Sequence, residues 1–528
     1  MKLKGSEILI RELVRHGTDT VFGYPGNSVL SLYDALRDHG EIRHFLPADE
    51  RGAVFMAEGY ARATGKAGVC IATSGPGATN LVTGIADAFS DSIPLVAITG
   101  NAPLEMLGHD GFQEVDTTGI TMPITKYNYI VKDVSALSET VSEAFHIALS
   151  GRRGPVLVDV PSNVFDEYAE YETKDFPEKK LSFDPAELEA AIETVNSSER
   201  PLIYAGGGVI AAKASAYVAE LSEKLCAPVG VSLKGIGAID ADDERYIGPG
   251  THANEVAKRA LREADLLISI GARFSSKATE KSPYSKNLRL LHLDIDASEI
   301  DKIHFADARL VGDVAITLPA LTKGVDKRNN DWFNNSERFE NATSSIPFQY
   351  IKCLNRRFGN RQLITTDVGQ HQLWVANYYD FSAPERFLSS CGLGAMGFGI
   401  GAAAGAAIAT GERVLYVTGD GSFNMCFNEL ATIVKYNLPV TIVIMNNSSL
   451  GMIREVQKRY YRGRYTDSDV FSPDYVALAR SFGIDDAFVV KNPKELERLI
   501  FSENFGKTIG STRPVLIDCR TGKNQKIL

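Results

Sequence analysis

The sequence contains few cysteines, and their spacing argues against the structural uses that cysteine clusters serve. Six occur in 528 residues, and no two of them form a C-x-x-C pair. A zinc site of the finger type and a disulfide framework both need closely grouped or regularly paired cysteines. We therefore expect six reduced thiols, most of them buried.

A long apolar segment and an excess of positive charge are also missing. The most lipid-like stretch, Gly399–Ala409, consists largely of glycine and alanine and is far shorter than the ~18 apolar residues of a spanning helix. The first residues lead directly into an amphipathic pattern, without the apolar core of a signal peptide. The net charge of −10 disfavours nucleic acid, because phosphate binding needs clustered Lys and Arg. We expect a cytoplasmic protein that contacts neither a membrane nor nucleic acid.

Short apolar runs rich in β-branched residues alternate with helical patterns along the whole chain. Continuous apolar strands separated by helices are typical of parallel sheets that are covered on both faces. The clearest runs cover residues 68–73, 94–99, 155–160, 266–270, 413–418 and 440–445. The predicted fold class is therefore α/β, with doubly wound parallel sheets.

Two polar stretches interrupt this alternation. Residues 165–183 are rich in Glu, Tyr, Lys and Asp, and residues 323–343 are rich in Asn, Asp and Lys. Interpreted as linkers, they divide the chain into three domains of residues 1–168, 185–325 and 345–528. Three domains also agree with the length of the chain, since one domain usually spans ~100–200 residues.

Polar side chains follow two neighbouring strands of the third domain, at the point where each strand ends. The segment Gly419–Ser422 follows one strand, and Asn446–Asn447 follows the next. Ligands of open α/β sheets bind at the carboxyl ends of the strands, where Asp420 and Asn447 would come together. Their oxygens are of the kind that magnesium prefers, with phosphate and water completing its coordination. Asp-Gly and Asn-Asn pairs are also common in turns, so each segment alone would not identify a metal site.

Together the two segments resemble the GDG…NN signature of thiamine-diphosphate enzymes. The resemblance implies a diphosphate held through magnesium, with the backbone carbonyl of Ser449 as the third protein contact to the metal. Gly421 and Ser422 would open a helix, continuing into residues 428–433, whose free N–H groups point toward the phosphates.

In the first domain, Glu50 lies in the segment Pro47–Ala53, which closely matches the acetohydroxyacid synthase family. In that family a glutamate of this domain hydrogen-bonds the aminopyrimidine ring of the cofactor and helps to activate it, and the resemblance places Glu50 at this catalytic position. From the residues alone, Asp49 and Glu50 could equally form a charged helix start, where carboxylates favour the helix dipole. We interpret Asp49 and Glu58 as ordinary charged helix residues.

The resemblance to acetohydroxyacid (acetolactate) synthases covers nearly the whole chain, with the first domain binding the pyrimidine and the third the diphosphate. It implies that Met396 is an apolar wedge behind the cofactor, where a gap-filling core methionine is the alternative. It places Gln113 near the reacting carbon and Gly26 on the loop that faces it, although a type II turn after Pro25 would also explain this glycine. The other implied cofactor contacts are Val368, Gly369, Gln370, His371, Gly394, Gly421, Ser422, Met425, Gly451 and Met452.

Three positions depart from the family, all on the side of the acceptor substrate. Asn27 stands where the family has a second glycine, and Ser162 stands where it has a lysine. Val456 replaces the tryptophan that narrows the acceptor pocket in anabolic members, and the loss of an indole opens space. We therefore expect Asn27 near the reacting carbon and a substrate pocket formed by Phe112, Ser162 and Val456.

The resemblance implies that a 2-oxo acid, expected to be pyruvate, loses carbon dioxide and passes its acyl unit to an acceptor carbonyl. A second pyruvate would give acetolactate, whereas a larger ketone or a keto-sugar would suit the opened pocket. A simple decarboxylase is a further alternative, which the absence of a His-His pair beside His109 disfavours. A flavin-dependent oxidase and a non-catalytic relative are the remaining alternatives.

The central domain leaves a nucleotide or flavin site open. Its Gly206–Gly208 turn follows a strand, as in nucleotide-binding domains, but lacks the GxGxxG spacing, so a tight turn is the simpler interpretation. Residues 248–252 match the flavin-contacting stretch of the family only loosely, although Arg273 is retained, so FAD is possible but disfavoured. By resemblance, the protein would form a homodimer or homotetramer with its sites between subunits.

Overall fold

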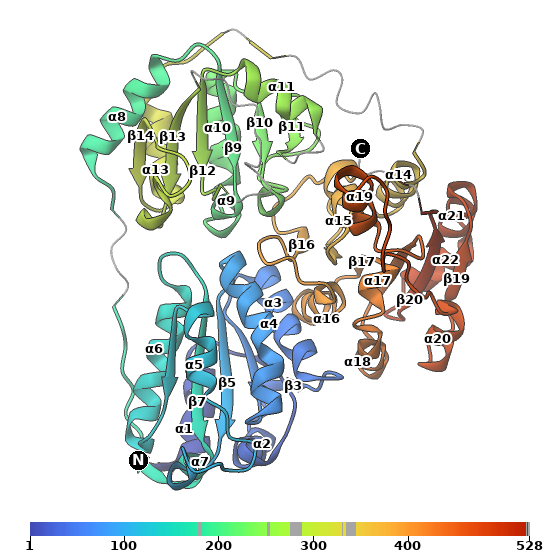
Figure 1. Cartoon of the computed structure of the whole chain (residues 1–528). Helices are drawn as coiled ribbons and strands as arrows, with labels where there is room; N and C mark the ends of the chain where they lie inside the picture. The colour runs from blue at the N-terminus through green and yellow to red at the C-terminus, as the bar shows by residue number, and fades with distance from the viewer. Residues whose placement is uncertain are drawn as a thin grey trace.

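Three six-stranded sheets organise the chain, and helices cover them (Figure 1). The computed structural model describes residues 1–177, 182–250, 254–274, 288–329, 331–333, 345–523 and 525. The described pairings within these three sheets are all parallel, which confirms the predicted α/β class. All six apolar runs identified in the sequence form strands.

The sheet of the first domain has the strand order β3-β2-β4-β5-β7-β6. Chain order therefore reverses between β2 and β4, which creates a topological switch point at the carboxyl ends of these strands. The elements of this part of the chain are β1 (Lys2–Lys4), α1 (Gly5–Arg15), β2 (Thr20–Gly23), α2 (Leu30–Asp38), β3 (Arg43–Phe45), α3 (Glu50–Thr64), β4 (Gly68–Ala72), α4 (Pro76–Asp91), β5 (Leu95–Asn101), α5 (Thr117–Thr121), β6 (Tyr127–Ile130), α6 (Leu137–Leu149), β7 (Pro155–Pro161), α7 (Ser162–Asp166) and β8 (Tyr168–Glu170).

The third domain repeats this topology, with the order β16-β15-β17-β18-β20-β19. Its switch point lies between β15 and β17, so the segments that follow these two strands face a common crevice. Its elements are α14 (Ile346–Phe358), β15 (Ile364–Thr366), α15 (Gln370–Tyr378), β16 (Phe387–Ser389), α16 (Phe398–Thr410), β17 (Val414–Gly419), α17 (Asp420–Phe423), α18 (Leu430–Lys435), β18 (Val440–Asn446), α19 (Gly451–Tyr460), α20 (Tyr475–Ser481), β19 (Ala487–Val490), α21 (Pro493–Ile500), α22 (Glu503–Ile509) and β20 (Val515–Arg520).

The central sheet has a different order, β11-β10-β9-β12-β13-β14, in which the chain reverses between β9 and β12. This is the order of dinucleotide-binding folds. The elements are α8 (Pro185–Asn196), β9 (Pro201–Ala205), α9 (Gly207–Ala211), α10 (Ser215–Leu225), β10 (Val229–Val231), β11 (Tyr246–Pro249), α11 (Glu255–Glu263), β12 (Leu266–Ile270), β13 (Arg289–Asp294), β14 (Ala308–Val311) and α13 (Val314–Gly324).

The first predicted linker is partly structured. Helix α7 ends within it, and β8 pairs antiparallel with β1, so that Tyr168 lies opposite Lys4. The polar composition of this stretch suits an exposed edge pairing as well as a linker, which is why the strand escaped prediction. The limits 1–168, 185–325 and 345–528 stay a prediction, and residues 178–181, 330 and 334–343 of the two linkers lie outside the described residues.

The glycine- and alanine-rich stretch of α16 is buried against α3 of the first domain. A Cβ on Gly59 would lie 2.2 Å from the carbonyl oxygen of Ala402, and a Cβ on Gly405 would lie 1.9 Å from the carbonyl oxygen of Met56. The two helix backbones therefore approach more closely than any side chain at these positions would allow. This contact joins the first domain to the third.

The described cysteines are all free, and four of the six are buried, in agreement with the expected reduced thiols. Within the described parts of the chain, no helix combines the length and the apolar character that crossing a bilayer requires.

We expect Gly59→Ala to destabilise the protein by about 1–3 kcal/mol, because an added methyl group overpacks the α3–α16 contact. Helix propensity alone would favour alanine over glycine by about 1 kcal/mol, so a net loss identifies the steric effect. Thermal unfolding measures the change.

The matched control is Gly40→Ala. A Cβ on Gly40 meets nothing within 4 Å, and the residue is exposed, so its effect should stay within about 0.5 kcal/mol. Equal midpoints for the two variants would contradict the close approach of α3 and α16.

Candidate cofactor site

Asp420 and Asn447 come together beside the switch point of the third domain, at the ends of the neighbouring strands β17 and β18. Asp420 begins α17 directly after β17, and Asn447 follows β18, which pairs in parallel with β17. The hydroxyl of Ser472 links the two strand ends, since it lies 2.9 Å from Asp420 Oδ2 and 3.3 Å from Asn446 Oδ1. Burial raises the pKa of Asp420, and the hydrogen bond from Ser472 partly offsets this rise. A divalent cation here would provide the positive charge that a buried carboxylate needs.

Two further polar atoms at this point have no partner within the described part of the chain. They are Asn447 Oδ1 and Ser449 Oγ, and both residues are buried. The amide nitrogen of Asn447 is directed at Gln370 Oε1 at 3.4 Å, which leaves its oxygen free. A buried acceptor without a partner costs about 1–3 kcal/mol, so an oxygen-seeking ion would stabilise this arrangement. The residues present therefore fit magnesium bound by Asp420, Asn447 and the carbonyl of Ser449.

The described residues contain no group of three or more His, Cys, Asp or Glu side chains that is placed to hold a metal. A site with one carboxylate, one amide and one backbone carbonyl needs phosphate and water oxygens to complete it. This donor set is typical of magnesium bound together with a phosphorylated ligand.

Glycines keep the crevice open around these oxygens. A Cβ on Gly369 or on Gly419 would lie 2.8 Å or 2.9 Å from the ring of His371, and a Cβ on Gly451 would lie 2.0 Å from Gln370 Oε1. His371 is buried, its Nε2 has no partner among the described residues, and burial lowers its pKa to about 3. A neutral imidazole with a free ring nitrogen can form one hydrogen bond with a diphosphate oxygen.

The remaining predicted diphosphate contacts surround this crevice. The hydroxyl of Ser422 donates to the carbonyl of Val368 at 3.2 Å, and the Met396 methyl carbon lies 3.9 Å from the position of a Cβ on Gly421. Met425 is 47% exposed, whereas Gly394 and Met452 are partly buried.

The helix predicted after Gly421 is much shorter than expected. Helix α17 ends at Phe423, a 3-10 turn covers Phe427–Glu429, and α18 begins only at Leu430. The break has a physical cause, because the turn residues are bound to the first domain. Asn428 Nδ2 donates to Asp49 Oδ2 at 3.2 Å, and the Glu429 carboxylate accepts the Ala48 N–H at 3.2 Å.

Glu50 is the first residue of α3, and Asp49 caps that helix by accepting the Gly52 N–H at 2.9 Å. The carboxylate of Glu50 accepts a hydrogen bond from Asn80 Nδ2 at 2.9 Å, and a Cβ on Gly77 would lie 3.2 Å from Glu50 Oε1. The carboxyl group is partly exposed and is therefore accessible to a ligand. The charged helix start that the residues alone suggested is observed, whereas the catalytic position of Glu50 stays a prediction.

The interpretation of Glu58 as an ordinary charged helix residue is wrong. Its side chain is fully buried and pairs with Arg62 at 3.2 Å. The sequence spacing indicated this pairing, because residues four positions apart lie next to each other on one face of a helix.

Gly26 is required by close packing and not by the positive φ of a type II turn. Its φ of −164° is extended, and a Cβ would lie 2.5 Å from Thr73. The close approach of the loop to Thr73, rather than the turn type, excludes a side chain here. Asn27 begins a short 3-10 turn and is exposed.

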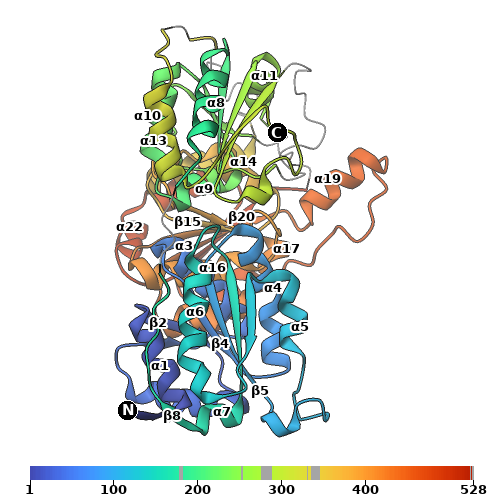
Figure 2. The same cartoon turned by 90° about the vertical axis from the view of Figure 1, so that its left-hand side faces the viewer.

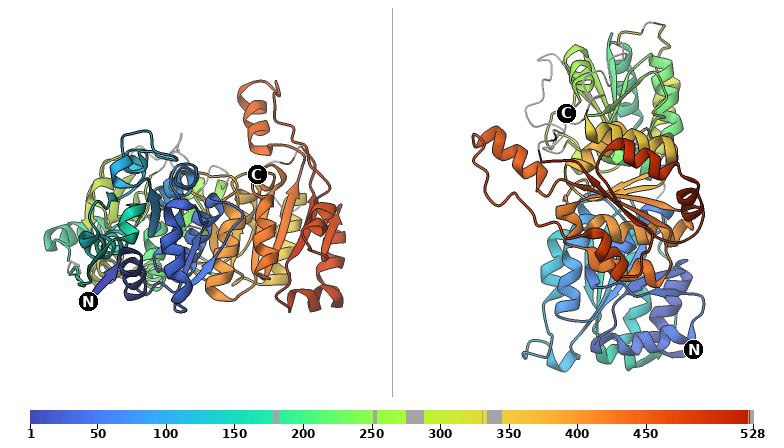
Figure 3. Two further views of the ribbon diagram at one scale, coloured as in Figure 1. Left: turned by 90° about the horizontal axis from the view of Figure 1, so that it is seen from below. Right: turned by 90° about the vertical axis from the view of Figure 1, so that its right-hand side faces the viewer.

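The other predicted substrate residues come from separate elements. Gln113 has a φ of +59° and packs its backbone against Gly75, where a Cβ would lie 2.7 Å from the Gln113 carbonyl oxygen. Phe112 is 79% exposed, and Ser162 begins α7 and is partly buried. Val456 is 41% exposed on α19, a helix that projects from the body of the chain (Figure 2, Figure 3).

Within one chain the Glu50 half and the magnesium half of the site are separate. Among the described residues, no hydrogen bond or ion pair joins Glu50 to Asp420, Asn447 or Ser449. Apolar side chains are exposed beside both halves, Phe112 beside one and Met425 beside the other. Exposed apolar groups of this kind mark surfaces that bind a ligand or a partner.

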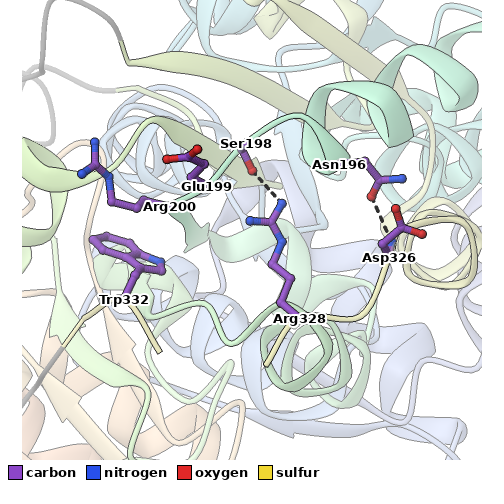
Figure 4. A pocket seen from close by; sticks show the side chains of 7 residues that line it. All are labelled: Asn196, Ser198, Glu199, Arg200, Asp326, Arg328 and Trp332. Carbon is purple, nitrogen blue, oxygen red and sulfur yellow. Dashed lines mark hydrogen bonds between the residues drawn. The ribbon is translucent and has the colours of Figure 1, made fainter. Parts of the chain in front are cut away.

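A cavity of about 580 Å³ lies elsewhere, at the edge of the central domain (Figure 4). The Arg328 guanidinium donates to Ser198 Oγ at 3.0 Å, and the Asp326 N–H donates to Asn196 Oδ1 at 2.9 Å. None of the predicted site residues lines it. The lining residues are Asn196, Ser198, Glu199, Arg200, Asp326, Arg328 and Trp332.

The glycine turn of the central domain is explained by packing. A Cβ on Gly206 would lie 2.2 Å from the carbonyl oxygen of Gly271, and a Cβ on Gly208 would lie 2.7 Å from the Gly271 Cα. The guanidinium of Arg273 donates to the carbonyl of Ser90 in the first domain. Thr251 and His252, in the segment compared with the flavin-contacting stretch, lie outside the described residues.

Comparison with known families matches three domain descriptions of the thiamine pyrophosphate enzymes. The N-terminal TPP binding domain matches residues 3–120, the central domain residues 188–321, and the C-terminal TPP binding domain residues 367–519. The third match contains the magnesium half of the site, and the first match contains Glu50.

The chain is similar over nearly its whole length to acetolactate synthases. It is 40% identical to the acetolactate synthase isozyme 2 large subunit of Escherichia coli, covering 93% of this chain and 91% of the relative. It is 39% identical to the acetolactate synthase large subunit of Parasynechococcus marenigrum, covering 99% and 88%. The chloroplastic acetolactate synthase of Arabidopsis thaliana is 39% identical, covering 92% and 78%.

We expect Asp420→Asn to weaken magnesium binding at least about 100-fold, since even groups outside the first coordination shell contribute 10- to 100-fold. The variant keeps the shape of the side chain but removes its charge. Titration of magnesium against the purified protein with thiamine diphosphate, followed by calorimetry, measures the change.

Asp469→Asn is the matched control, because Asp469 lies opposite Ser449 and its carboxylate is 64% exposed. Its removal should leave magnesium affinity within about twofold. Equal affinities for the Asp420 variant and the unmodified protein would rule out the assigned metal contact.

Proposed function

The chain belongs to the acetolactate synthase family of thiamine pyrophosphate enzymes, and we propose that it decarboxylates the 2-oxo acid pyruvate and joins the remaining acyl unit to an acceptor carbonyl. The observation that carries the proposal is the buried Asp420 carboxylate beside the unpartnered Asn447 oxygen. Both lie beside the switch point of the sheet, in a crevice that glycines keep open.

The residues of the third domain fit the diphosphate end of the cofactor. Asp420, Asn447 and the Ser449 carbonyl would hold magnesium, with His371 as a neutral hydrogen-bonding partner of the diphosphate. Met396, whose methyl carbon lies 3.9 Å from the position of a Cβ on Gly421, would support the cofactor through apolar contact. When bound, thiamine diphosphate supplies the electron sink for the carbanion that remains after carbon dioxide is lost.

Glu50 would act on the aminopyrimidine ring, exchanging a proton between its carboxyl oxygen and a ring nitrogen. Asn80 orients the carboxylate by a hydrogen bond, and the Asp49 cap fixes the first turn of the helix that carries it. The carboxyl group is thus placed by two contacts before any ligand binds. Such preorganisation lowers the cost of reaching the reactive geometry.

We infer that two chains form each active site. Glu50 contacts Asn80 of its own domain, and no hydrogen bond or ion pair among the described residues joins it to the magnesium half in the third domain. A second copy would bring its Glu50 to the magnesium half of the first and would cover Phe112, Met425 and Val456, which are exposed in a single chain. The assembly would be a homodimer or a homotetramer, and its two-fold symmetry would give two equivalent sites.

A larger acceptor than pyruvate is the second candidate within the same chemistry. Val456 on α19 is exposed and small, and Asn27 places an amide where a glycine is usual in the family. Both features favour a bulkier carbonyl compound, such as a ketone or a keto-sugar. The proposal includes no flavin, because residues 248–252 match the flavin-contacting stretch of the family only loosely.

We expect the purified protein with thiamine diphosphate and magnesium to form acetolactate from pyruvate, and Glu50→Gln to lower kcat at least about 100-fold. The amide keeps the size of the side chain but cannot hold the exchangeable proton. Assays for acetolactate, acetaldehyde and peroxide are run in parallel.

Glu41→Gln makes the same change at a carboxylate that is 64% exposed in the same domain, and kcat should stay within about twofold. Full turnover by the Glu50 variant would overturn the mechanism. Acetaldehyde as the sole product would indicate a decarboxylase, and peroxide would indicate a flavin-dependent oxidase.

We expect Val456→Trp to lower kcat/KM for a cyclic ketone acceptor at least about tenfold while leaving the decarboxylation of pyruvate within about twofold. An indole added at this position fills the space available to the acceptor, and contacts of this size are worth ~1–3 kcal/mol. Competition between pyruvate and the ketone as acceptors, followed by product analysis, measures the ratio.

Val489→Trp is the matched control, since Val489 is 43% exposed on β19, away from the site. An unchanged product ratio for Val456→Trp would remove this residue from the acceptor pocket.

A further inference from the structure

A buried group of charges lies where the first domain meets the third. Arg62, in the last turn of α3, forms ion pairs with Glu58 at 3.2 Å, Asp87 at 3.4 Å and Asp91 at 2.9 Å. The side chains of the three acids are at most 1% exposed, and that of Arg62 is 7% exposed. Charges taken out of water in this way are retained only where further hydrogen bonds satisfy them.

Those further hydrogen bonds go to one short segment of the third domain. The Asp91 carboxylate accepts the N–H groups of Cys391 at 3.0 Å and Gly392 at 2.8 Å. Arg62 Nη1 donates to the carbonyl of Ser389 at 3.1 Å. Side chains of the first domain therefore hold the backbone that follows β16.

Ser390, within this segment, forms two further hydrogen bonds. Its hydroxyl donates to Asp87 Oδ1 and accepts the N–H of Ala395 at 2.7 Å. The segment is thereby closed into a loop, with the Ser390 hydroxyl at its centre. Ser390 itself is fully buried, so no water competes for these contacts.

The central domain fixes the other end of the same group. Lys234 Nζ donates to the carbonyl of Asp91, and Arg273 donates to the carbonyl of Ser90, at the carboxyl end of α4. Cations at this end of a helix also interact favourably with its dipole. Three domains therefore meet at Asp91.

The pKa values of these acids are shifted in opposite directions. Burial and the proximity of Asp87 raise the pKa of Glu58 well above its ordinary value. Although burial acts in the opposite direction, Arg62 and Lys234 hold the pKa of Asp91 below its ordinary value. Arg62 therefore favours the ionised form of Asp91, the carboxylate that accepts the two backbone N–H groups.

The loop held in this way leads directly to Met396. Gly394 and Gly397, on either side of it, have φ values of +79° and +88°, a region that glycine adopts freely. The backbone at Met396 is therefore not fixed by its own conformational preferences. It is held by the Ala395 N–H on one side and on the other by the N–H of Gly399, which Asp367 accepts at 2.8 Å.

We propose that Arg62, Asp87, Asp91 and Ser390 are positioning residues that fix the loop 389–395 and, through it, the place of Met396 in the cofactor crevice. The proposal rests on the proposed function, in which Met396 supports the cofactor. It adds that the first domain of the same chain, and not only the magnesium half of the site, determines where that support lies.

The test compares Ser390→Ala, Met396→Ala and the double variant. Ser390→Ala removes one hydroxyl and should lower kcat by between about 10- and 100-fold, with KM for pyruvate within about twofold, since small displacements in a site have effects of this size. Because Ser390 acts through Met396, the double variant should be no slower than Met396→Ala alone. Thermal unfolding of each variant verifies that the fold is retained.

A second measurement does not depend on turnover. In the protein labelled at its methionine methyl groups and free of cofactor, Ser390→Ala should shift or broaden the Met396 resonance. Ser138→Ala is the matched control, because the Ser138 hydroxyl also donates to a buried carboxylate, Glu12 at 2.9 Å, far from the loop. It should leave both the resonance and kcat unchanged. Should Ser390→Ala fail to fold, Asp87→Asn takes its place in both measurements.

The outcomes separate this proposal from the function on which it rests. If Met396→Ala slows turnover while Ser390→Ala has no effect, or if the two effects multiply, the positioning network is overturned and the proposed reaction stands. If Met396→Ala leaves kcat unchanged, the role of Met396 and this proposal both fail. Loss of turnover in Glu50→Gln continues to support the reaction in each of these cases.

Discussion

The close packing of α3 against α16 is the contact on which the arrangement of the molecule depends. The two helices can pack this closely because glycines carry no side chain where the backbones meet. A Cβ on Gly59 or on Gly405 would have no room there. Dispersion forces between closely packed atoms are individually small, but they accumulate over an interface that excludes water. The two helices also carry or directly follow the groups that matter for chemistry, since Glu50 begins α3 and Met396 precedes α16. A shift of one helix against the other would therefore move both groups.

The two ends of helix α3 have different functions. Glu50 at its start would face the cofactor bound by a partner chain, whereas Arg62 near its end holds the loop of its own third domain. The two residues are 12 positions apart, or about 18 Å along the helix axis at a rise of 1.5 Å per residue. In a dimer with sites between subunits, one rigid element would then serve two active sites. A displacement of α3 at one site would also displace this helix at the other site, because a packed helix moves as a unit.

Much of the fold and of the cofactor site could be predicted, since both depend on local patterns. The apolar runs identify the strands, and two polar segments after neighbouring strands identify the place where Asp420 and Asn447 meet. What could not be predicted depends on contacts between distant segments. Glu58 looks like a surface residue until Arg62 and the third domain cover it, and the short helix α17 ends early because the residues after it are bound to the first domain. The strand β8 was missed because its polar sequence also suits a linker, and because β1, with which it pairs, lies at the other end of the first domain's sequence.

The fold fixes the residues proposed to bind the cofactor more firmly than those proposed to meet the acceptor. The oxygens proposed to hold magnesium follow two central strands of a buried sheet, so their spacing is fixed by the parallel pairing of β17 with β18. The residues that would meet the acceptor lie instead on a projecting helix and on loops, as Val456 on α19 and Asn27 in its 3-10 turn show. Substitutions there change the shape of the pocket without disturbing the sheet, because few buried contacts depend on them. Cofactor chemistry is therefore constrained by the core, whereas acceptor choice can change at little cost in stability.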